Sequence, residues 1–214
     1  MLRTTNMSSI VIFGATQQAE LANFYFKLAG HQVDFHCVDD EYFQDENICG
    51  TPIIPTSEMF DKNLCESHQL HVAIGFSKLN KNRQKTYEKM KKKGFSFISY
   101  ISEQATILSS SIGENCFILE NNVIQPFVEI ADNVVLWSGN HIGHHSKIHR
   151  HVFISSHVVI SGNCSVGKNC FIGVNATIID GVHVGKENII GANALIKRDT
   201  EDSKIFPVSD TAPR

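Results

Sequence analysis

From Ser111 to Thr200 the chain repeats in units of six residues: SIGENC, FILENN, VIQPFV, EIADNV, VLWSGN, HIGHHS, KIHRHV, FISSHV, VISGNC, SVGKNC, FIGVNA, TIIDGV, HVGKEN, IIGANA and LIKRDT. The second place of every unit is aliphatic, and the sixth is mostly small or β-branched. Side chains alternate along a strand, so these two places point the same way, into a core. A period of six leaves no single apolar face on a helix of 3.6 residues per turn. The repeat therefore predicts β-structure.

Glycine recurs at the third place of several units, where a corner needs either positive φ or a close backbone approach. Each unit is then one short strand plus one corner, and three units close a triangular coil of 18 residues. About five coils follow from the fifteen units. We expect a parallel β-helix, here called the prism, from about Ala105 to Thr200.

The residues before the prism have a different pattern. Ser9–Phe13 is an apolar strand that runs into Gly14, Gln17–Leu28 has helical spacing, and 33–38 is a second strand. This order predicts a βαβ unit and the start of a small parallel sheet. A further strand at 71–74, a helix at 82–93 and a strand at 96–101 complete the expected elements. The expected domains are 1–104 and 105–214.

Composition excludes several function classes. The net charge of the 214 residues is −3, which gives no reason to expect a nucleic-acid partner. No stretch approaches the roughly 18 continuous apolar residues of a membrane span, and no signal peptide is visible. The six cysteines form no CxxC pair, and the three in the prism occupy its sixth, core-facing place. A reducing cytoplasm is therefore the expected compartment.

Both halves resemble one family. The prism resembles the hexapeptide-repeat acyltransferases, whose β-helix is left-handed. Val38-Asp39-Asp40, Gly50-Thr51-Pro52-Ile53-Ile54 and Ala73-Ile74-Gly75 followed by Arg83 extend the likeness from about Ser9 to Lys197. They resemble bacterial sugar acetyltransferases, which include sialic acid O-acetyltransferases and N-acetyltransferases of nucleotide-linked 4-amino-4,6-dideoxysugars. The implied fold is a small Rossmann-like βαβ domain followed by a left-handed parallel β-helix.

The resemblance also implies a substrate site in the front domain. In the family, an aspartate pair lies near the base of a nucleotide-sugar, and a glycine-rich first turn lies near its phosphates. The expected substrate-binding residues are therefore Gly14, Gln17, Asp39, Asp40 and Arg83. The first turn here holds one glycine where the family usually has several, so the first turn by itself is a weak phosphate loop.

His144 is the expected catalytic residue. It is the fourth place of HIGHHS, and Gly162 stands at the same place one coil later. A base and a backbone N–H beside one thioester are what acyl transfer requires. The resembling family has its catalytic histidine at this place, usually followed by an acid, whereas this chain has His145. We expect the other prism histidines to be surface or packing residues.

The coenzyme and assembly follow from the same resemblance. Acetyl-CoA is expected beside the last coils between subunits of a homotrimer, with Gly162 at its acyl end and Lys197 and Arg198 at its phosphates. Neither a metal ion nor a membrane or nucleic-acid partner is expected.

The predicted activity is acetyl-CoA-dependent N-acetylation of a nucleotide-linked amino-deoxysugar, for a bacterial surface glycan such as lipopolysaccharide. Three alternatives remain open. One is O-acetylation of a sialic acid or another sugar hydroxyl. Another is a zinc-dependent carbonic anhydrase, which needs three converging imidazoles, and the last is a scaffold without catalytic activity.

Overall fold

The computed structural model describes residues 9–207 and divides the chain into two compact units. The front unit comprises the residues up to Gly75 together with Lys85–Tyr100, and the second comprises Phe76–Gln84 and the chain from Ile101 onward. The predicted front domain, 1–104, includes 76–84, whereas the structure assigns this segment to the prism unit.

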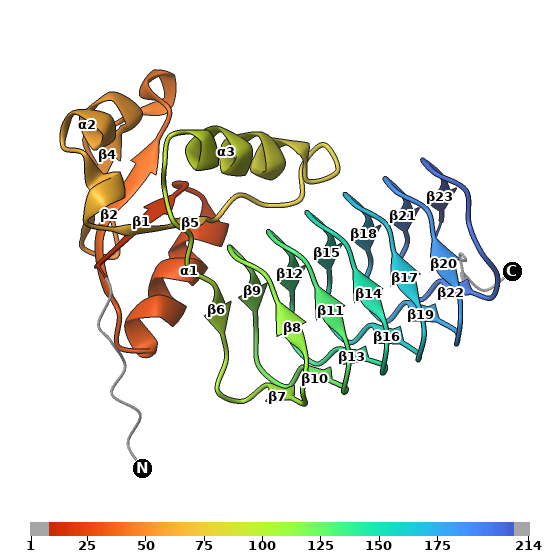
Figure 1. Cartoon of the computed structure of the whole chain (residues 1–214). Coiled ribbons are helices and arrows are strands. Elements are labelled where there is room, and N and C mark those ends of the chain that lie inside the picture. The colour runs from red at the N-terminus through yellow and green to blue at the C-terminus, as the bar shows by residue number, and fades with distance from the viewer. Residues whose placement is uncertain (1–8, 208–214) are drawn as a thin grey trace, which may run out of the picture. The chain divides into compact units, whose positions relative to one another are not determined.

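The front unit is built on a sheet of five strands, in the order β3-β4-β2-β1-β5 (Figure 1). All neighbours are parallel except β3 and β4. The strands are β1 (Ser9–Phe13), β2 (Gln32–Val38), β3 (Asn47–Ile48), β4 (Thr51–Pro55) and β5 (Gln69–Val72). The carboxyl ends of β1, β2, β4 and β5 therefore meet at one edge of the sheet.

Two helices before the prism strands follow the expected pattern closely. Helix α1 has the predicted bounds, Gln17–Leu28, and buries Ala19, Ala22 and Phe26. Helix α3 (Lys81–Lys92) begins one residue earlier than predicted. Five elements before the prism were not predicted: the strands β3 and β4, the helix α2 (Thr56–Asp61) and the 3-10 turns η1 (Asp40–Tyr42) and η2 (Leu64–Glu66). No helix among the residues described here has both the length and the apolar character of a membrane span.

The prism is a left-handed parallel β-helix with three walls, as predicted. Equivalent residues of successive coils pair in register 18 positions apart, as in Val123–His141–Val159. The first wall contains β7 (Thr106–Ile107), β10 (Val123–Ile124), β13 (His141–Ile142), β16 (Val159–Ile160), β19 (Thr177–Ile178) and β22 (Leu195–Ile196). The second contains β8 (Ser111–Ile112), β11 (Glu129–Ile130), β14 (Lys147–Ile148), β17 (Ser165–Val166) and β20 (His183–Val184). The third contains β6 (Tyr100–Ile101), β9 (Phe117–Ile118), β12 (Val135–Leu136), β15 (Phe153–Ile154), β18 (Phe171–Ile172), β21 (Ile189–Ile190) and β23 (Ile205–Phe206).

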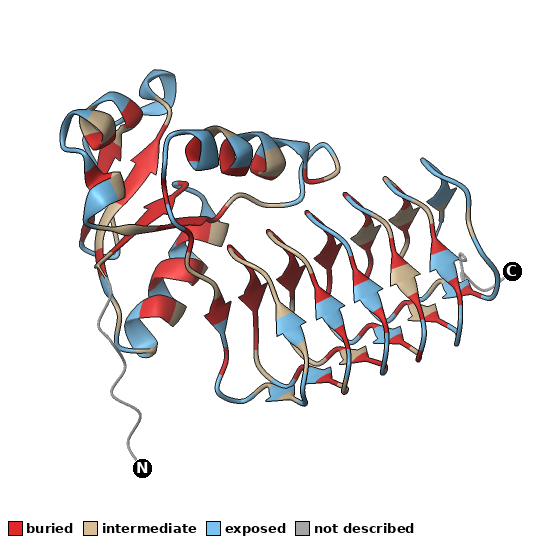
Figure 2. Cartoon of the chain, viewed as in Figure 1, coloured by how far each residue is buried: buried red, intermediate tan, exposed pale blue. Residues whose placement is uncertain are grey.

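The second and sixth places form the core of the prism. Residues such as Ile142, Ile160 and Cys170 are fully buried, and buried positions recur along successive strands (Figure 2). Three sixth places hold buried asparagines instead of apolar residues. Asn122, for example, donates to the carbonyl oxygens of Leu119 and Trp137. These amides satisfy corner carbonyls that would otherwise be buried without a donor.

At the corners, the residue with positive φ is at the fifth place of the unit rather than the third. Asn163, His145, His151 and His157 all lie in the left-handed region, at φ of 57, 58, 65 and 58°. Asparagine and histidine are among the residues that tolerate this region best. The third-place glycines serve close approach, because a β-carbon on Gly173 would lie 2.6 Å from the Ala192 nitrogen.

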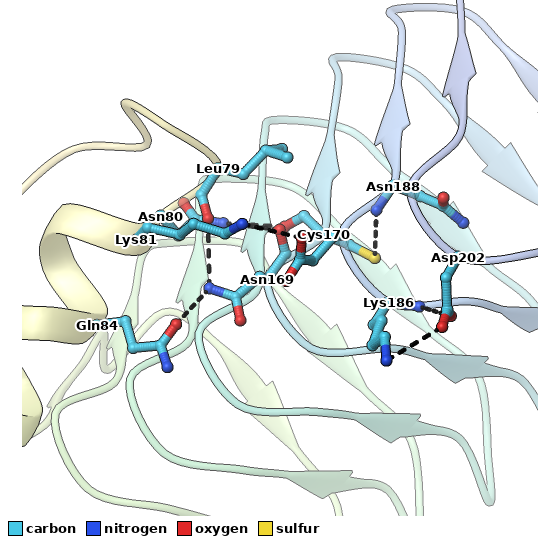
Figure 3. Close-up of polar contacts among 10 residues, drawn as sticks. Leu79, Asn80, Lys81, Gln84, Asn169, Cys170, Lys186, Asn188 and Asp202 are labelled. Atoms are coloured by element: carbon cyan, nitrogen blue, oxygen red, sulfur yellow. Dashed lines mark hydrogen bonds and ion pairs between the residues drawn. The ribbon is translucent and has the colours of Figure 1, made fainter.

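The segment Phe76–Gln84 is held on the third wall of the prism (Figure 3). The Asn80 amide donates to the carbonyl oxygen of Cys170 at 3.1 Å, and the Asn169 amide donates to Gln84 Oε1 at 2.9 Å. The Phe76 ring packs against Phe171, with centroids 4.8 Å apart. This segment is therefore a fixed part of the second unit.

Candidate functional site

Two of the predicted site residues, His144 and Gly162, lie next to each other on successive coils. His144 follows β13 at an exposed corner, and Gly162 lies directly above it, because the Asn163 N–H donates to the His144 carbonyl at 2.8 Å. A β-carbon on Gly162 would lie 2.7 Å from His144 Cε1 and 2.8 Å from its Nε2. Only glycine leaves room for the ring, so the Nε2 edge of the imidazole faces the Gly162 backbone.

The other edge of the His144 ring faces His145. The two Nδ1 atoms are 3.1 Å apart, so one ring donates a hydrogen bond and the other accepts it. If His144 donates, its Nε2 is left with a lone pair that can accept a proton. The Phe127 ring packs on His145 with centroids 4.7 Å apart, and Gln125 Oε1 accepts from the His144 backbone N–H at 2.9 Å. The corner is therefore supported on its lower side by the preceding coil.

The Gly162 backbone N–H is available to a ligand. Within residues 9–207, no protein acceptor is bonded to this N–H. The neighbouring His144 N–H, by contrast, is used by Gln125. An unused N–H and an imidazole nitrogen at one place are the two kinds of group that acyl transfer from a thioester needs.

Sequence reasoning missed Asp180, which belongs to the same column. It stands at the fourth place two coils beyond His144, and its Oδ1 would lie 2.9 Å from a β-carbon on Gly162. The period of 18 residues was the signal that could have identified it. Arg198 continues the column one coil further, so four successive coils place a candidate side chain or bare backbone at one corner.

Lys197 and Arg198 line an open cavity of about 700 Å³ at the last coil. The cavity is formed by residues 195–201 with Lys204 and Phe206. Both predicted cations are exposed, and they lie on the coil that follows Asp180. The cavity is large enough for part of a coenzyme-sized anion.

Gly14 and Gln17 lie where β1 ends and α1 begins. Gly14 has φ of 139°, and a β-carbon there would lie 2.7 Å from the Ala73 carbonyl oxygen. Its N–H donates to the Cys37 carbonyl, and its own carbonyl contacts His36 Nδ1 at 3.0 Å. Burial lowers the pKa of His36, so this histidine is neutral at pH 7. The backbone of Gly14 therefore has a structural role in the turn between β1 and α1.

Gln17 is exposed and lines an open cavity of about 440 Å³ along α1, together with Glu20, Leu21, Phe24 and Cys49. The first N–H groups of a helix have no partner within the helix and favour anions. This end of α1 opens at the carboxyl edge of the parallel strands, where ligands of open α/β sheets usually bind.

The aspartate pair at the end of β2 has protein partners on both residues. Asp39 Oδ1 accepts from Lys89 Nζ at 2.6 Å. Asp40 Oδ1 accepts from the Ser57 N–H and from Thr56 Oγ1, both at 2.9 Å, at the start of α2. The Ser57 backbone hydrogen bond and the Thr56 hydroxyl lower the pKa of Asp40. Asp39 remains half-exposed just after the end of β2, whereas Asp40 is hydrogen-bonded to the start of α2.

Arg83 is buried and serves the prism. It is 1% exposed, and its guanidinium donates to the carbonyl oxygens of Asn133, His151 and Val152 and to Asn133 Oδ1. Desolvation lowers its pKa to about 9. Its location therefore favours a structural role over the substrate contact that the sequence predicts.

The histidine-rich coils bear on the zinc alternative, which needs three converging imidazoles. Over the described range 9–207, the structure brings together no three histidine, cysteine, aspartate or glutamate side chains that could hold a metal ion.

Comparison with known proteins supports the fold of both units. The model of the bacterial transferase hexapeptide (six repeats) matches residues 109–144 and 163–198. No curated protein gives a significant match to the chain.

Solved structures match nearly the whole chain. Perosamine N-acetyltransferase from Caulobacter crescentus, in complex with CoA and GDP-perosamine, is 25% identical, covers 93% of both chains and has a TM-score of 0.83. The acetyltransferase domain of PglB from Neisseria gonorrhoeae is 24% identical, covers 94% of this chain and 96% of its own, and has a TM-score of 0.83. WeeI from Acinetobacter baumannii is 16% identical, covers 92% and 94%, and has a TM-score of 0.57. The chain therefore carries hexapeptide repeats of the bacterial transferase type and is similar over nearly its whole length to solved sugar acetyltransferases, as the sequence indicates.

Proposed function

We propose that this chain transfers the acetyl group of acetyl-CoA to an amino group of a nucleotide-linked amino-deoxysugar, with His144 as general base. The observation that carries the proposal is the approach of the His144 Nε2 edge to the bare backbone of Gly162. The C. crescentus relative, which is described with CoA and GDP-perosamine, supports this class of donor and acceptor.

The chemistry uses groups that this corner supplies. The neutral amine attacks the carbonyl carbon of the thioester, so a C–N bond forms and the C–S bond breaks. His144 Nε2 takes a proton from the attacking nitrogen, and the coenzyme leaves as the thiol once that proton is passed on. The Gly162 N–H stabilises the oxyanion that develops on the acetyl oxygen.

The coenzyme phosphates are proposed to bind at Lys197 and Arg198, on the cavity at the last coil. The nucleotide-sugar is proposed to bind at the carboxyl edge of the front sheet, beside Gln17 and Asp39. The open end of α1 supports this choice. Arg83 is left out of the proposed substrate site because its donors are already used within the prism.

A homotrimer is proposed as the working assembly. The first wall carries outward apolar residues that are substantially exposed, namely Val123, Val159 and Leu195 at 36, 40 and 50%. Packing copies through this wall would remove them from water. Light scattering after gel filtration tests the assembly. Val159→Asp should release subunits, whereas Lys147→Asp on the second wall should not.

A cytoplasmic location and a role in surface-glycan (lipopolysaccharide) biosynthesis are proposed with the activity. All six cysteines are free, which suits a reducing compartment. Acetyl-CoA and nucleotide-sugars are the proposed small-molecule partners, without a metal cofactor, nucleic acid or membrane.

The test is release of CoA with acetyl-CoA and a panel of nucleotide-linked amino sugars that includes GDP-perosamine. Each amino sugar is paired with its hydroxyl counterpart. Turnover of amino sugars supports the proposal. Turnover confined to the hydroxyl compounds would instead indicate an O-acetyltransferase, and no turnover with either would remove the proposed activity.

A further inference from the structure

Asp180 is a carboxylate close to the proposed base that makes no ion pair or hydrogen bond with another residue in the described range 9–207. The carboxylate is exposed, and among residues 9–207 no donor or cation is bonded to it. Arg198, one coil further along the column, makes no ion pair with it. The side chain is therefore available to a ligand.

The position of this carboxylate is defined by Gly162. Asp180 Oδ1 and His144 Nε2 would lie 2.9 and 2.8 Å from one point, the place of a β-carbon on Gly162. The two atoms are therefore less than about 6 Å apart, on either side of the bare Gly162 backbone. A ligand group about 3 Å from each, an ordinary hydrogen-bond distance, can bridge them.

An unpaired carboxylate in this place raises the energy barrier of the reaction unless a positive charge lies beside it. Negative charge develops on the acetyl oxygen and on the departing sulfur, and a nearby anion raises the energy of both. The acceptor supplies the compensating charge, because an amine reaches the site mostly as an ammonium ion at pH 7. A hydroxyl acceptor has no such charge.

We infer that Asp180 recognises the ammonium group of the acceptor and so selects amines over hydroxyls at the His144 corner. The inference rests on the proposed function and adds a specificity-determining residue to it. Asp180 holds the ammonium at Oδ1, and one N–H proton of that group passes to solvent water before the neutral amine attacks the thioester. The attack makes the nitrogen positive again beside Oδ1, until His144 takes the next proton. The net reaction is unchanged: ammonium and acetyl-CoA give amide, CoA thiol and one released proton.

The test compares Asp180→Asn, Asp180→Glu and the parent protein with the amino sugar from the panel that the parent turns over best. Asp180→Asn should raise the KM for that amino sugar roughly tenfold to a hundredfold, the range for loss of a hydrogen bond to a charged group. The Ki of the hydroxyl counterpart, measured as an inhibitor, and the KM for acetyl-CoA should stay within twofold of the parent values. Asp180→Glu, which keeps the charge, should recover part of the loss.

Glu129→Gln is the matched control, because it removes one exposed carboxylate from the second wall, where Glu129 pairs with Lys147. It should leave all three constants unchanged. Equal weakening of the amino sugar and its hydroxyl counterpart would overturn the inference, as would a rise in the KM for acetyl-CoA alone. A fall in kcat with unchanged KM would indicate that the Asp180 carboxylate interacts with the His144 imidazolium and not with the acceptor. That result would also overturn the inference. A parent that turns over no acceptor defeats the proposed function itself, which is a different result.

Discussion

The Nδ1 atoms of His144 and His145 lie 3.1 Å apart, so the residue after the proposed base is its direct hydrogen-bond partner. The sequence suggested that His145 cannot replace an orienting acid, because an imidazole carries no fixed negative charge. The geometry shows that it can still accept a hydrogen bond and so favour the His144 tautomer that has a lone pair on Nε2. His145 therefore orients the ring without adding a full charge.

This relationship predicts unequal effects of the two histidines. His144→Ala should lower kcat by about 10²–10⁴, the usual contribution of a positioned general base. His145→Ala should lower it by about tenfold or less, because one neutral hydrogen bond is lost. The KM values should change little in both variants. Higher pH should partly restore His144→Ala, since more of the amine is then neutral.

Steady-state kinetics from pH 6 to 9 provide the measurement, and His149→Ala on the second wall is the control. Near-parental kcat in His144→Ala, together with collapse in His145→Ala, would mean that the base is misassigned.

Gly162→Ala should impair catalysis more than folding. The added methyl would lie within 2.9 Å of His144 Cε1, His144 Nε2 and Asp180 Oδ1, and exposed side chains can move away from it. We expect kcat to fall at least tenfold, since small misplacements of catalytic groups are costly, while Tm changes by about 2 °C or less. Ser161→Ala, one residue earlier, is the control. Full activity in Gly162→Ala would show that the reacting thioester does not occupy this space.

Much of the prism was predictable because its period is local and unbroken. The second-place aliphatic residues, the coil of 18 residues and the stacking of Gly162 on His144 all follow from counting. Asp180 follows from the same count, although it was not considered. Helix α1 was predicted to the residue because its apolar spacing and Gly30 are also local signals.

Arg83 was not predictable in the same way. Its partners Asn133 and His151 are 50 and 68 residues away in the sequence, and no periodic pattern connects them with 76–84. Asn80, at φ of 62°, turns this segment toward the prism, and such turns are not visible in residue order. The family resemblance suggested substrate contact for Arg83, whereas packing determines its place.

The buried position of Arg83 predicts a stability effect. Arg83→Met removes the buried guanidinium hydrogen bonds to the carbonyl oxygens of Asn133, His151 and Val152 and to Asn133 Oδ1, and offers no donor in their place. The free energy of unfolding should fall by about 3 kcal/mol, with a Tm lower by about 6–12 °C. Lys81→Met is the control, because its exposed pair with Glu187 contributes about 1 kcal/mol or less. Calorimetry and the KM for the sugar distinguish the roles: a substrate residue would raise KM without lowering Tm.

The last prediction concerns the cations at the end of the prism. Changing Lys197 and Arg198 together to alanine should raise the KM for acetyl-CoA by about tenfold or more, because two charge-assisted contacts to phosphate are lost. Both kcat and the KM for the sugar should stay near the parental values, since neither side chain is proposed to contact the reacting atoms. The effect should shrink as salt is added, because exposed ion pairs are screened. The matched control is the double alanine variant at Lys147 and Arg150, two exposed cations that pair with Glu129 and Asp132 on other coils. Equal KM values for acetyl-CoA in both double variants would place the coenzyme phosphates away from the last coil, while leaving His144 and Gly162 in their proposed roles.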